Sequence, residues 1–369
     1  MIPAPRARPG VQAAFEILRG TLGTVFTCAV LQVRQHGDTI FEGALGQLAP
    51  GGDAARTDSI FDLASLTKLF AGTALLALFD QRRIALDDPI VGVIPAFAGR
   101  DARRESVTFR HLLTHSAGLP AHVNLRDEVG AAAVIARVCS TPLAYTPGDD
   151  AVYSDLGFML IGEAIARIER RPLADALEAL VTEPLRIADV GYRPSIELRD
   201  RIACTENDPW RGRLLCGEVH DENCWAMGGA AGHAGLFGTA ASVLDLAEAF
   251  RNGGELQLQR VLARSTSMLA VREQARSRDG QERRGMAWAL KVSDASSCGA
   301  RFSSQSFGHT GYTGTSIWVD PTRALSVALL TNRVHVSRNP DPIRALRVAV
   351  CDTIAAAVDE GAVRCGSRD

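Results

Sequence analysis

The residues best suited to chemistry begin with Ser65 and Lys68, three positions apart at the start of an apolar segment, 65–79, that is typical of a helix. This spacing brings two side chains onto one helix face. A serine hydroxyl is a weak nucleophile until a neighbouring base takes its proton, and an amine in an apolar cleft loses proton affinity. We therefore predict that Lys68 acts as a base that activates Ser65.

Lysine is almost absent from the chain. Of 40 basic residues only Lys68 and Lys291 are lysines, and the rest are arginines. Arginine keeps its proton in proteins, whereas a buried lysine can lose it. Lys68 therefore stands where a titratable amine is useful, and Lys291, in a strand-like segment, is expected to be an ordinary surface charge.

A tyrosine and a carboxylate form a second group. Tyr153 and Asp155 follow a Pro-Gly-Asp-Asp turn and immediately precede a predicted helix at 156–167. A phenol beside a cation has a lowered pKa and can serve as a general base or proton relay. The alternative is a tyrosine at the edge of the core followed by an aspartate that caps the helix.

Three glycines interrupt an apparent strand in the segment 307–314, Phe-Gly-His-Thr-Gly-Tyr-Thr-Gly. Glycine within a strand often marks the close approach of a ligand or of another backbone segment. A substrate along this edge would have its carbonyl oxygen held by the backbone N–H groups of Tyr312 and Ser65. A glycine-rich hairpin without a ligand is the alternative.

Taken together and in this order, the three groups resemble the signature of the serine β-lactamase and penicillin-binding-protein superfamily. The Tyr-Ser-Asp sequence at 153–155 is similar to the class C β-lactamase-like branch, which includes family VIII carboxylesterases, D-aminopeptidases and DD-peptidases. The resemblance covers residues 11–358 and extends to the segments 61–64, 86–89, 111–120 and 235–240.

The resemblance implies a role for each matching position. Ser65 would be the nucleophile, Lys68 its activating amine, and Tyr153 a partner in the base role that also protonates the leaving group. The oxyanion hole would consist of the N–H groups of Ser65 and Tyr312. His309 would take the place of the lysine in the third motif, and the substrate-binding residues would be His122, Asp155, Thr310 and Gly311. No cofactor or metal is implied.

Two positions depart from the β-lactamase pattern. Asp155 stands where class C β-lactamases have asparagine, and an ionised aspartate accepts hydrogen bonds but donates none. His309 replaces a lysine, and a neutral histidine attracts a substrate carboxylate less strongly. Both changes favour esters or amides without that carboxylate over penicillins and cephalosporins.

These residues predict a serine hydrolase that forms an acyl-enzyme on Ser65, with esterase activity on short acyl esters and weak β-lactamase activity. A D-amino-acid peptidase, a DD-peptidase and a true β-lactamase are the alternatives among enzymes. A non-catalytic protein that binds muropeptides or penicillin is the alternative of another class. The expected partner is a small ester, amide or β-lactam, and the sequence does not indicate an oligomeric state.

Composition narrows the possibilities further. A net charge of -2 provides no basic excess for nucleic acid, and the longest apolar run, 69–79, is about half of what a membrane span needs. The eight cysteines form no Cys-x-x-Cys pair, which favours reduced thiols and a cytoplasmic location. The first ten residues show no signal-peptide pattern, although a periplasmic or secreted location stays open if a leader has been removed.

A zinc site is a further alternative, drawn from five cysteines and histidines between positions 204 and 233. Their spacing is wider than structural zinc sites usually show, so no metal is predicted. The five residues are Cys204, Cys216, His220, Cys224 and His233.

The elements that must position these residues predict an α+β fold. Strands are expected near both ends of the chain, at 25–35, 39–46, 285–292, 307–310, 315–319 and 325–331. Helices are expected at 11–19, 110–115, 127–138, 156–167, 173–181, 241–252 and 342–358. We therefore expect a β-lactamase/transpeptidase-like fold. Residues 1–85 and 241–369 would form an antiparallel sheet flanked by helices, and the mainly helical segment 86–240 would be inserted beside it, with the active site in the cleft between the two.

Overall fold

The computed structural model describes residues 9–366, and its main feature is one antiparallel sheet built from both ends of the chain. This confirms the predicted fold class. The N-terminal residues from which no signal peptide was predicted lie largely outside the described range. Along the sheet the strands are β10 (Ala275–Arg276), β11 (Arg283–Arg284), β12 (Ala289–Leu290), β13 (Phe307–Thr310), β14 (Ser316–Asp320), β15 (Leu325–Thr331), β1 (Cys28–Gln35) and β2 (Asp38–Gly46).

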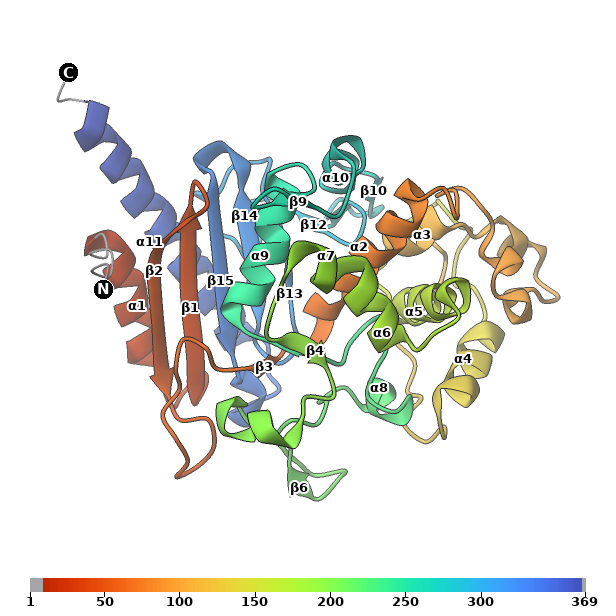
Figure 1. Cartoon of the computed structure of the whole chain (residues 1–369), viewed down its shortest axis with the longest axis horizontal. Coiled ribbons are helices and arrows are strands. Elements are labelled where there is room, and N and C mark those ends of the chain that lie inside the picture. The colour runs from red at the N-terminus through yellow and green to blue at the C-terminus, as the bar shows by residue number, and fades with distance from the viewer. Residues whose placement is uncertain (1–8, 367–369) are drawn as a thin grey trace.

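Alternating side chains of the central strand β1 give the sheet two buried faces. Ala29 and Leu31 point to one face, where they pack against helices α1 (Pro9–Thr21) and α11 (Asp341–Gly366). Cys28 and Val30 point to the other face and join the main core, which includes α9 (Ala240–Arg251). Figure 1 shows α1 and α11 on one side of the sheet and α9 with the helical part of the chain on the other.

The rest of the molecule is mainly helical. Helix α2 (Thr67–Asp80) is apolar all round and almost completely buried, because it passes through the centre of the main core. The other helices are α3 (Phe109–Leu113), α4 (Ala131–Ser140), α5 (Asp155–Glu169), α6 (Leu173–Leu177), α7 (Glu183–Leu185), α8 (Glu222–Ala226) and α10 (Arg264–Ala270). The domain limits at 85/86 and 240/241 stay a prediction.

Short strands complete the fold. A three-stranded sheet places β7 (Leu236–Gly238) between β3 (Phe61–Asp62) and β4 (Val190–Tyr192). Two small hairpins are formed by β5 (Asn207–Asp208) with β6 (Arg213–Leu214) and by β8 (Glu255–Leu256) with β9 (Gln259–Arg260). None of the helices in the described part of the chain combines the length and the apolar character of a membrane span.

Among the predicted elements that are shorter than expected, two have a clear cause in the backbone. The strand predicted over 285–292 is reduced to β12, since Ala287 adopts a positive φ of 66° that breaks the extended backbone. The helix predicted over 127–138 begins only at Ala131. Gly130, with φ of 86°, turns the chain just before it.

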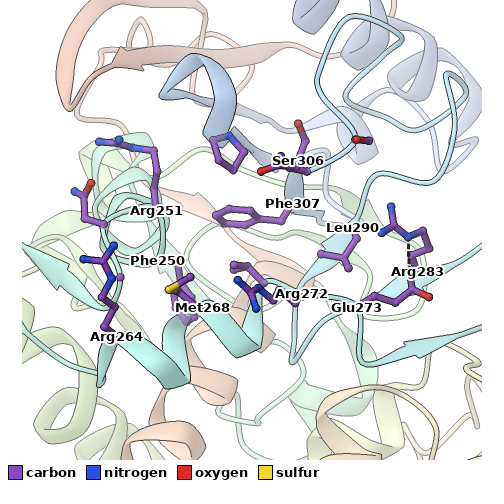
Figure 2. A pocket seen from close by; sticks show the side chains of 16 residues that line it. Phe250, Arg251, Arg264, Met268, Arg272, Glu273, Arg283, Leu290, Ser306 and Phe307 are labelled. Carbon is purple, nitrogen blue, oxygen red and sulfur yellow. Dashed lines mark hydrogen bonds and ion pairs between the residues drawn. The ribbon is translucent and has the colours of Figure 1, made fainter.

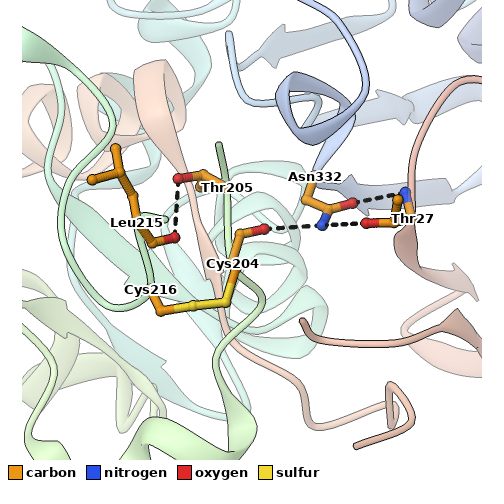
Figure 3. The surroundings of a disulfide bond; sticks show 6 residues. All are labelled: Thr27, Cys204, Thr205, Leu215, Cys216 and Asn332. Atoms are coloured by element: carbon orange, nitrogen blue, oxygen red, sulfur yellow. Dashed lines mark hydrogen bonds between the residues drawn. A yellow bond between two sulfur atoms is a disulfide. The ribbon is translucent and has the colours of Figure 1, made fainter. Parts of the chain in front are cut away.

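The prediction of reduced cysteines is wrong for one pair. Cys204 and Cys216 form a disulfide twelve positions apart, and Cys204 also accepts a hydrogen bond at its carbonyl from the Asn332 side chain at 2.9 Å (Figure 3). The sequence could not reveal this pair, because connectivity depends on the fold. The pairing removes the thiol argument for a cytoplasmic location, since disulfides persist in oxidising compartments.

Candidate active site

The turn that carries Ser65 is held in a strained conformation. It follows β3 as a 3₁₀ turn, Ala64–Leu66, and Ala64 has φ of 47°, which residues with a side chain rarely adopt. The buried carboxylate of Asp62 accepts the N–H of Ala64 at 2.8 Å and that of His220 at 2.7 Å. Asp62 therefore fixes the turn and ties it to the loop that borders the site.

Lys68 lies beneath Ser65 and is completely buried. Its Nζ donates to Ser65 Oγ at 3.0 Å and to the carbonyl of His233 at 3.0 Å, and it forms an ion pair with Asp155 at 2.7 Å. The spacing of Ser65 and Lys68 in the sequence thus produces the predicted contact. With these three partners, the three N–H donors of an ammonium are all used.

The prediction of a lowered pKa for Lys68 is wrong. Burial by itself would lower the pKa of the amine, but the carboxylate of Asp155 and the phenol of Tyr153 outweigh burial and raise it. The same ion pair holds the pKa of Asp155 well below its usual range, although burial alone would raise it. Lys68 is therefore an ammonium at neutral pH, and it is unsuited to be the base in the resting protein.

The phenol of Tyr153 lies over the same ammonium. Lys68 Nζ is 4.9 Å from the ring centroid, and the guanidinium carbon of Arg284 is 5.1 Å from it. Burial raises the pKa of Tyr153, while the charge of Lys68 and hydrogen bonds with Lys68 and Ser65 oppose part of that rise. The lowered phenol pKa expected from the sequence is thus wrong, because burial exceeds the effect of the cation.

The turn after β13 brings Tyr312 to the same site. Thr313 donates to the carbonyl of Asp62 at 2.8 Å, and Thr315 donates to that of Leu63 at 3.0 Å. A Cβ atom on Gly311 would meet Thr315 Oγ1 at 2.1 Å, so only glycine fits there. These bonds couple the peptide around Tyr312 to the turn that carries Ser65.

A cavity of about 380 Å³ opens over Ser65. Of the predicted site residues, Ser65, His122, Tyr153, Asp155 and Tyr312 line it. Lys68, His309, Thr310 and Gly311 are not among its lining residues. The remaining lining residues are Ala64, His220, Asp221, Glu222, Ala234 and Arg338.

The walls of this cavity carry more carboxylates than free cations. Asp221 pairs with His233 at 2.9 Å. Arg338 is shared between Glu206 at 2.9 Å and Glu222 at 3.2 Å. Asp155 lies 3.8 Å from His122 and raises its pKa, because the carboxylate favours the protonated ring. A substrate with its own carboxylate thus meets no unpaired arginine or lysine on these walls.

Comparison with known proteins identifies the family. A family model described as Beta-lactamase matches residues 16–350. The chain belongs to the β-lactamase family. An Escherichia coli K12 relative named as a D-alanyl-D-alanine carboxypeptidase is 30% identical over 311 residues, which is 76% of this chain and 70% of the relative.

Two solved structures are similar over nearly the whole chain. A penicillin-binding-protein homologue from Caulobacter crescentus has a TM-score of 0.75 at 21% identity and covers 96% of this chain and 99% of its own. EstCE1, a hydrolase with promiscuous acyltransferase activity, has a TM-score of 0.73 at 21% identity, covering 93% of this chain and 98% of its own. At these identities the likeness shows the fold.

In this member of the β-lactamase family, His309 is buried behind Tyr153, with ring centroids 5.8 Å apart. Its Nδ1 donates to the carbonyl of Thr310 at 2.9 Å, because a carbonyl can only accept. Burial lowers the pKa of His309 to about 3, and the charges of Lys68 and Arg284 add to this effect. The ring is therefore neutral, and its buried Nε2 has no hydrogen-bond partner within the described residues.

Sequence reasoning missed two residues that enclose Tyr153. His115 lies with its ring centroid 4.6 Å from that of Tyr153, and its Nδ1 accepts the N–H of Ser154 at 3.0 Å. Burial lowers its pKa well below the usual value. Arg284 reaches the ring from β11, far along the sequence. His115 belongs to a segment that carries the family resemblance, whereas no sequence signal marks Arg284.

The five residues of the zinc alternative are engaged elsewhere. Cys204 and Cys216 are bonded to each other, and Cys224 donates its thiol to the carbonyl of Ala234 at 3.2 Å. His220 contacts Glu206 at 2.6 Å, and His233 contacts Asp221. Within residues 9–366, no three histidine, cysteine or carboxylate side chains are grouped to hold a metal ion.

Proposed function

We propose that this protein is a serine hydrolase that forms an acyl-enzyme on Ser65 and acts on short, uncharged acyl esters. The observation that carries the proposal is the 3.0 Å contact between Ser65 Oγ and Lys68 Nζ on the floor of a cavity that Tyr153 also lines. A serine nucleophile beside a fixed cation, with a phenol ring 4.9 Å from that cation, can carry out acyl transfer.

In this proposal the base is the phenolate of Tyr153. It takes the proton of Ser65 as Oγ attacks the acyl carbonyl, and the new phenol then protonates the departing alkoxide. The fixed charge of Lys68, held by Asp155, stabilises the phenolate that this cycle needs. Water then attacks the acyl-enzyme and gives a proton to Tyr153, which passes it to the departing Oγ of Ser65 and becomes a phenolate again.

The N–H groups of Ser65 and Tyr312 are proposed to hold the oxyanion. This role is supported by the hydrogen bonds that the hydroxyl groups of Thr313 and Thr315 donate. They fix the turn around Tyr312 against the turn that carries Ser65. Rigid donors aimed at the developing charge cost no reorganisation during the reaction.

The preference for uncharged esters rests on the charges around the cavity. His309 is neutral, Lys68 is paired with Asp155, and Arg338 is paired with Glu206 and Glu222, so the cavity offers no unpaired lysine or arginine to a substrate carboxylate. β-Lactams and peptides ending in D-alanine bring a carboxylate into such a site, which costs electrostatic free energy. EstCE1, which shares the fold, is described as a hydrolase with acyltransferase activity.

A D-alanyl-D-alanine carboxypeptidase is the second candidate, favoured by the name of the Escherichia coli relative. A substrate panel separates the two: p-nitrophenyl butyrate, a chromogenic cephalosporin and a D-alanyl-D-alanine peptide, each with wild type and Ser65→Ala. We expect turnover of the ester by wild type only, with a fluorophosphonate adduct on Ser65 seen by mass spectrometry. Faster turnover of the peptide than of the ester would favour the second candidate.

Two results would remove the enzymatic proposal altogether. One is full ester hydrolysis by Ser65→Ala, which would place the chemistry elsewhere. The other is tight binding of muropeptides or penicillin without turnover of any substrate, which would indicate a non-catalytic binding protein.

A further inference from the structure

A second cavity, larger than the one over Ser65, lies at the opposite end of β13 from the site residues. Its volume is about 870 Å³, within the range of cavities that bind small molecules. Phe307, the first residue of β13, contributes to it, together with Phe250 of α9, Leu290 of β12 and Met268 of α10. None of the residues that line the cavity over Ser65 contributes to it.

The floor of this cavity is apolar and preformed. Phe250 and Phe307 are almost completely buried, and Trp288 packs edge-on between them with ring centroids 5.0 Å from each. Met268 beside them is 39% exposed, so its side chain adds to the apolar surface that the cavity presents. The apolar part of a ligand would find a rigid surface here.

The rim of the cavity is strongly cationic, with four arginines and one carboxylate, Glu273. Arg251 is held by Glu248 at 2.6 Å, and Arg283 by Glu273 at 2.6 Å. Glu273 is also bound by Arg276 at 2.9 Å, so its charge is fully compensated. Figure 2 shows the pair of Arg283 and Glu273 at one end of the cavity and Arg251 at the other, with Phe307 between.

The two other arginines of the rim, Arg264 and Arg272, are exposed and make no ion pair within the described residues. Arg264 is seated by Gly253, whose missing side chain leaves room for it: a Cβ there would lie 3.0 Å from Arg264 Cγ. Unpaired guanidinium groups beside an apolar floor match an anionic group on an apolar body, since guanidinium binds carboxylate and phosphate in two-point fashion.

We propose that this cavity binds a small amphiphilic anion, with the carboxylate or phosphate at Arg264 and Arg272 and the apolar chain over Phe250, Phe307 and Met268. This site is separate from the proposed active site and independent of its chemistry. It also differs from it in charge, because the cavity over Ser65 is lined by carboxylates.

Isothermal titration calorimetry with octanoate, octyl phosphate and 1-octanol tests the proposal on the whole chain. We expect both anions to bind the wild type more tightly than the alcohol, and the stronger of the two to reveal which head group the site prefers. Arg264→Ala combined with Arg272→Ala should weaken anion binding by about tenfold or more, because two charge-assisted contacts are lost.

The matched control removes two exposed arginines outside the cavity, Arg137 and Arg199, by the same substitutions. It should bind within twofold of wild type, and all three proteins should keep the same melting temperature and ester hydrolysis. Equal binding of octanoate by the Arg264/Arg272 variant and wild type would place the anion elsewhere and overturn the proposal. So would binding of 1-octanol as tight as that of the anions.

Discussion

The only two lysines of the chain are both buried, yet their surroundings differ in kind. Lys68 contacts a hydroxyl, a carbonyl and the carboxylate of Asp155, and it lies under an open cavity. Lys291 was expected on the surface, which is wrong, since it is 7% exposed and donates to the carbonyls of Ala300 at 2.7 Å and Phe302 at 2.6 Å. Its nearest carboxylate, Asp294, is 83% exposed at 3.6 Å.

The two lysines show that a buried ammonium group can have either a structural or a chemical role. Around Lys291 the ammonium donates to two loop carbonyls, those of Ala300 and Phe302, for which the described residues provide no other donor, so its role is structural. Around Lys68 the charge is balanced by the partly buried carboxylate of Asp155 and faces a nucleophile and a phenol, so it changes the chemistry of its neighbours. Burial of a lysine therefore does not identify a functional site unless its partners are known.

The largest expected effect comes from replacing each lysine with methionine. Lys68→Met should reduce kcat/KM for p-nitrophenyl butyrate by about 10³-fold or more, because Tyr153 loses the cation that stabilises its phenolate. Lys291→Met should leave kcat/KM within a few-fold but lower the free energy of unfolding by about 3 kcal/mol, since two buried carbonyls lose their donor. Urea denaturation and steady-state kinetics on both variants measure this. A similar loss of kcat/KM in both variants would show that Lys68 and Lys291 do not differ in their role in catalysis.

The carboxylates beside the lysines provide a second comparison. Asp155→Asn should reduce ester turnover by about tenfold or more, because burial then lowers the pKa of Lys68 and part of it becomes neutral. The pH profile should gain a falling limb on its alkaline side. Asp294→Asn should change activity and stability little, since exposed ion pairs contribute about 0–1 kcal/mol. If Asp155→Asn alters only KM for amide substrates and leaves the profile unchanged, Asp155 contacts substrate and does not control Lys68.

The pH dependence of kcat/KM separates the two possible bases. Burial raises the pKa of Tyr153 above its usual 10, so activity should rise by about tenfold per pH unit from neutral to alkaline pH as phenolate forms. Lys68 stays protonated over this range, so its titration adds neither a rising nor a falling limb to the pH profile of kcat/KM. The Lys291→Met profile should coincide with that of wild type. A plateau that begins near pH 7 would instead indicate a base with a lowered pKa.

A further effect concerns stability in acid. Burial and the charge of Lys68 hold His309 neutral with a pKa of about 3, whereas the unfolded chain protonates this ring at about 6.5. Below pH 6.5 the unfolded state binds more protons, so stability should fall by about 1.4 kcal/mol per pH unit from this group, down to its folded pKa. His309→Gln should show a shallower loss between pH 6.5 and 5 in urea denaturation. An unchanged slope would mean that other groups, such as buried His115, account for the loss.

Much of the fold could be predicted from hydrophobic periodicity. The strands β13 and β15 have the predicted bounds, and the helices that cover the sheet lie where their apolar patterns indicated. The errors occur where backbone conformation breaks the pattern, as at Ala287 and Gly130. The disulfide between Cys204 and Cys216 was missed because pairing depends on which loops meet in space.

By itself the sequence determined the family resemblance and the contact of Ser65 with Lys68, because three residues span about one turn of the 3₁₀ segment that leads into α2. Only the tertiary structure decided the charge of Lys68 and the pKa of Tyr153. Both depend on how deeply the two side chains are buried and on how close Asp155 lies to them, and that arrangement arises from segments far apart in the chain. The tertiary structure alone also decided the arginine-lined cavity. Its residues come from α9, α10 and the strands β11, β12 and β13.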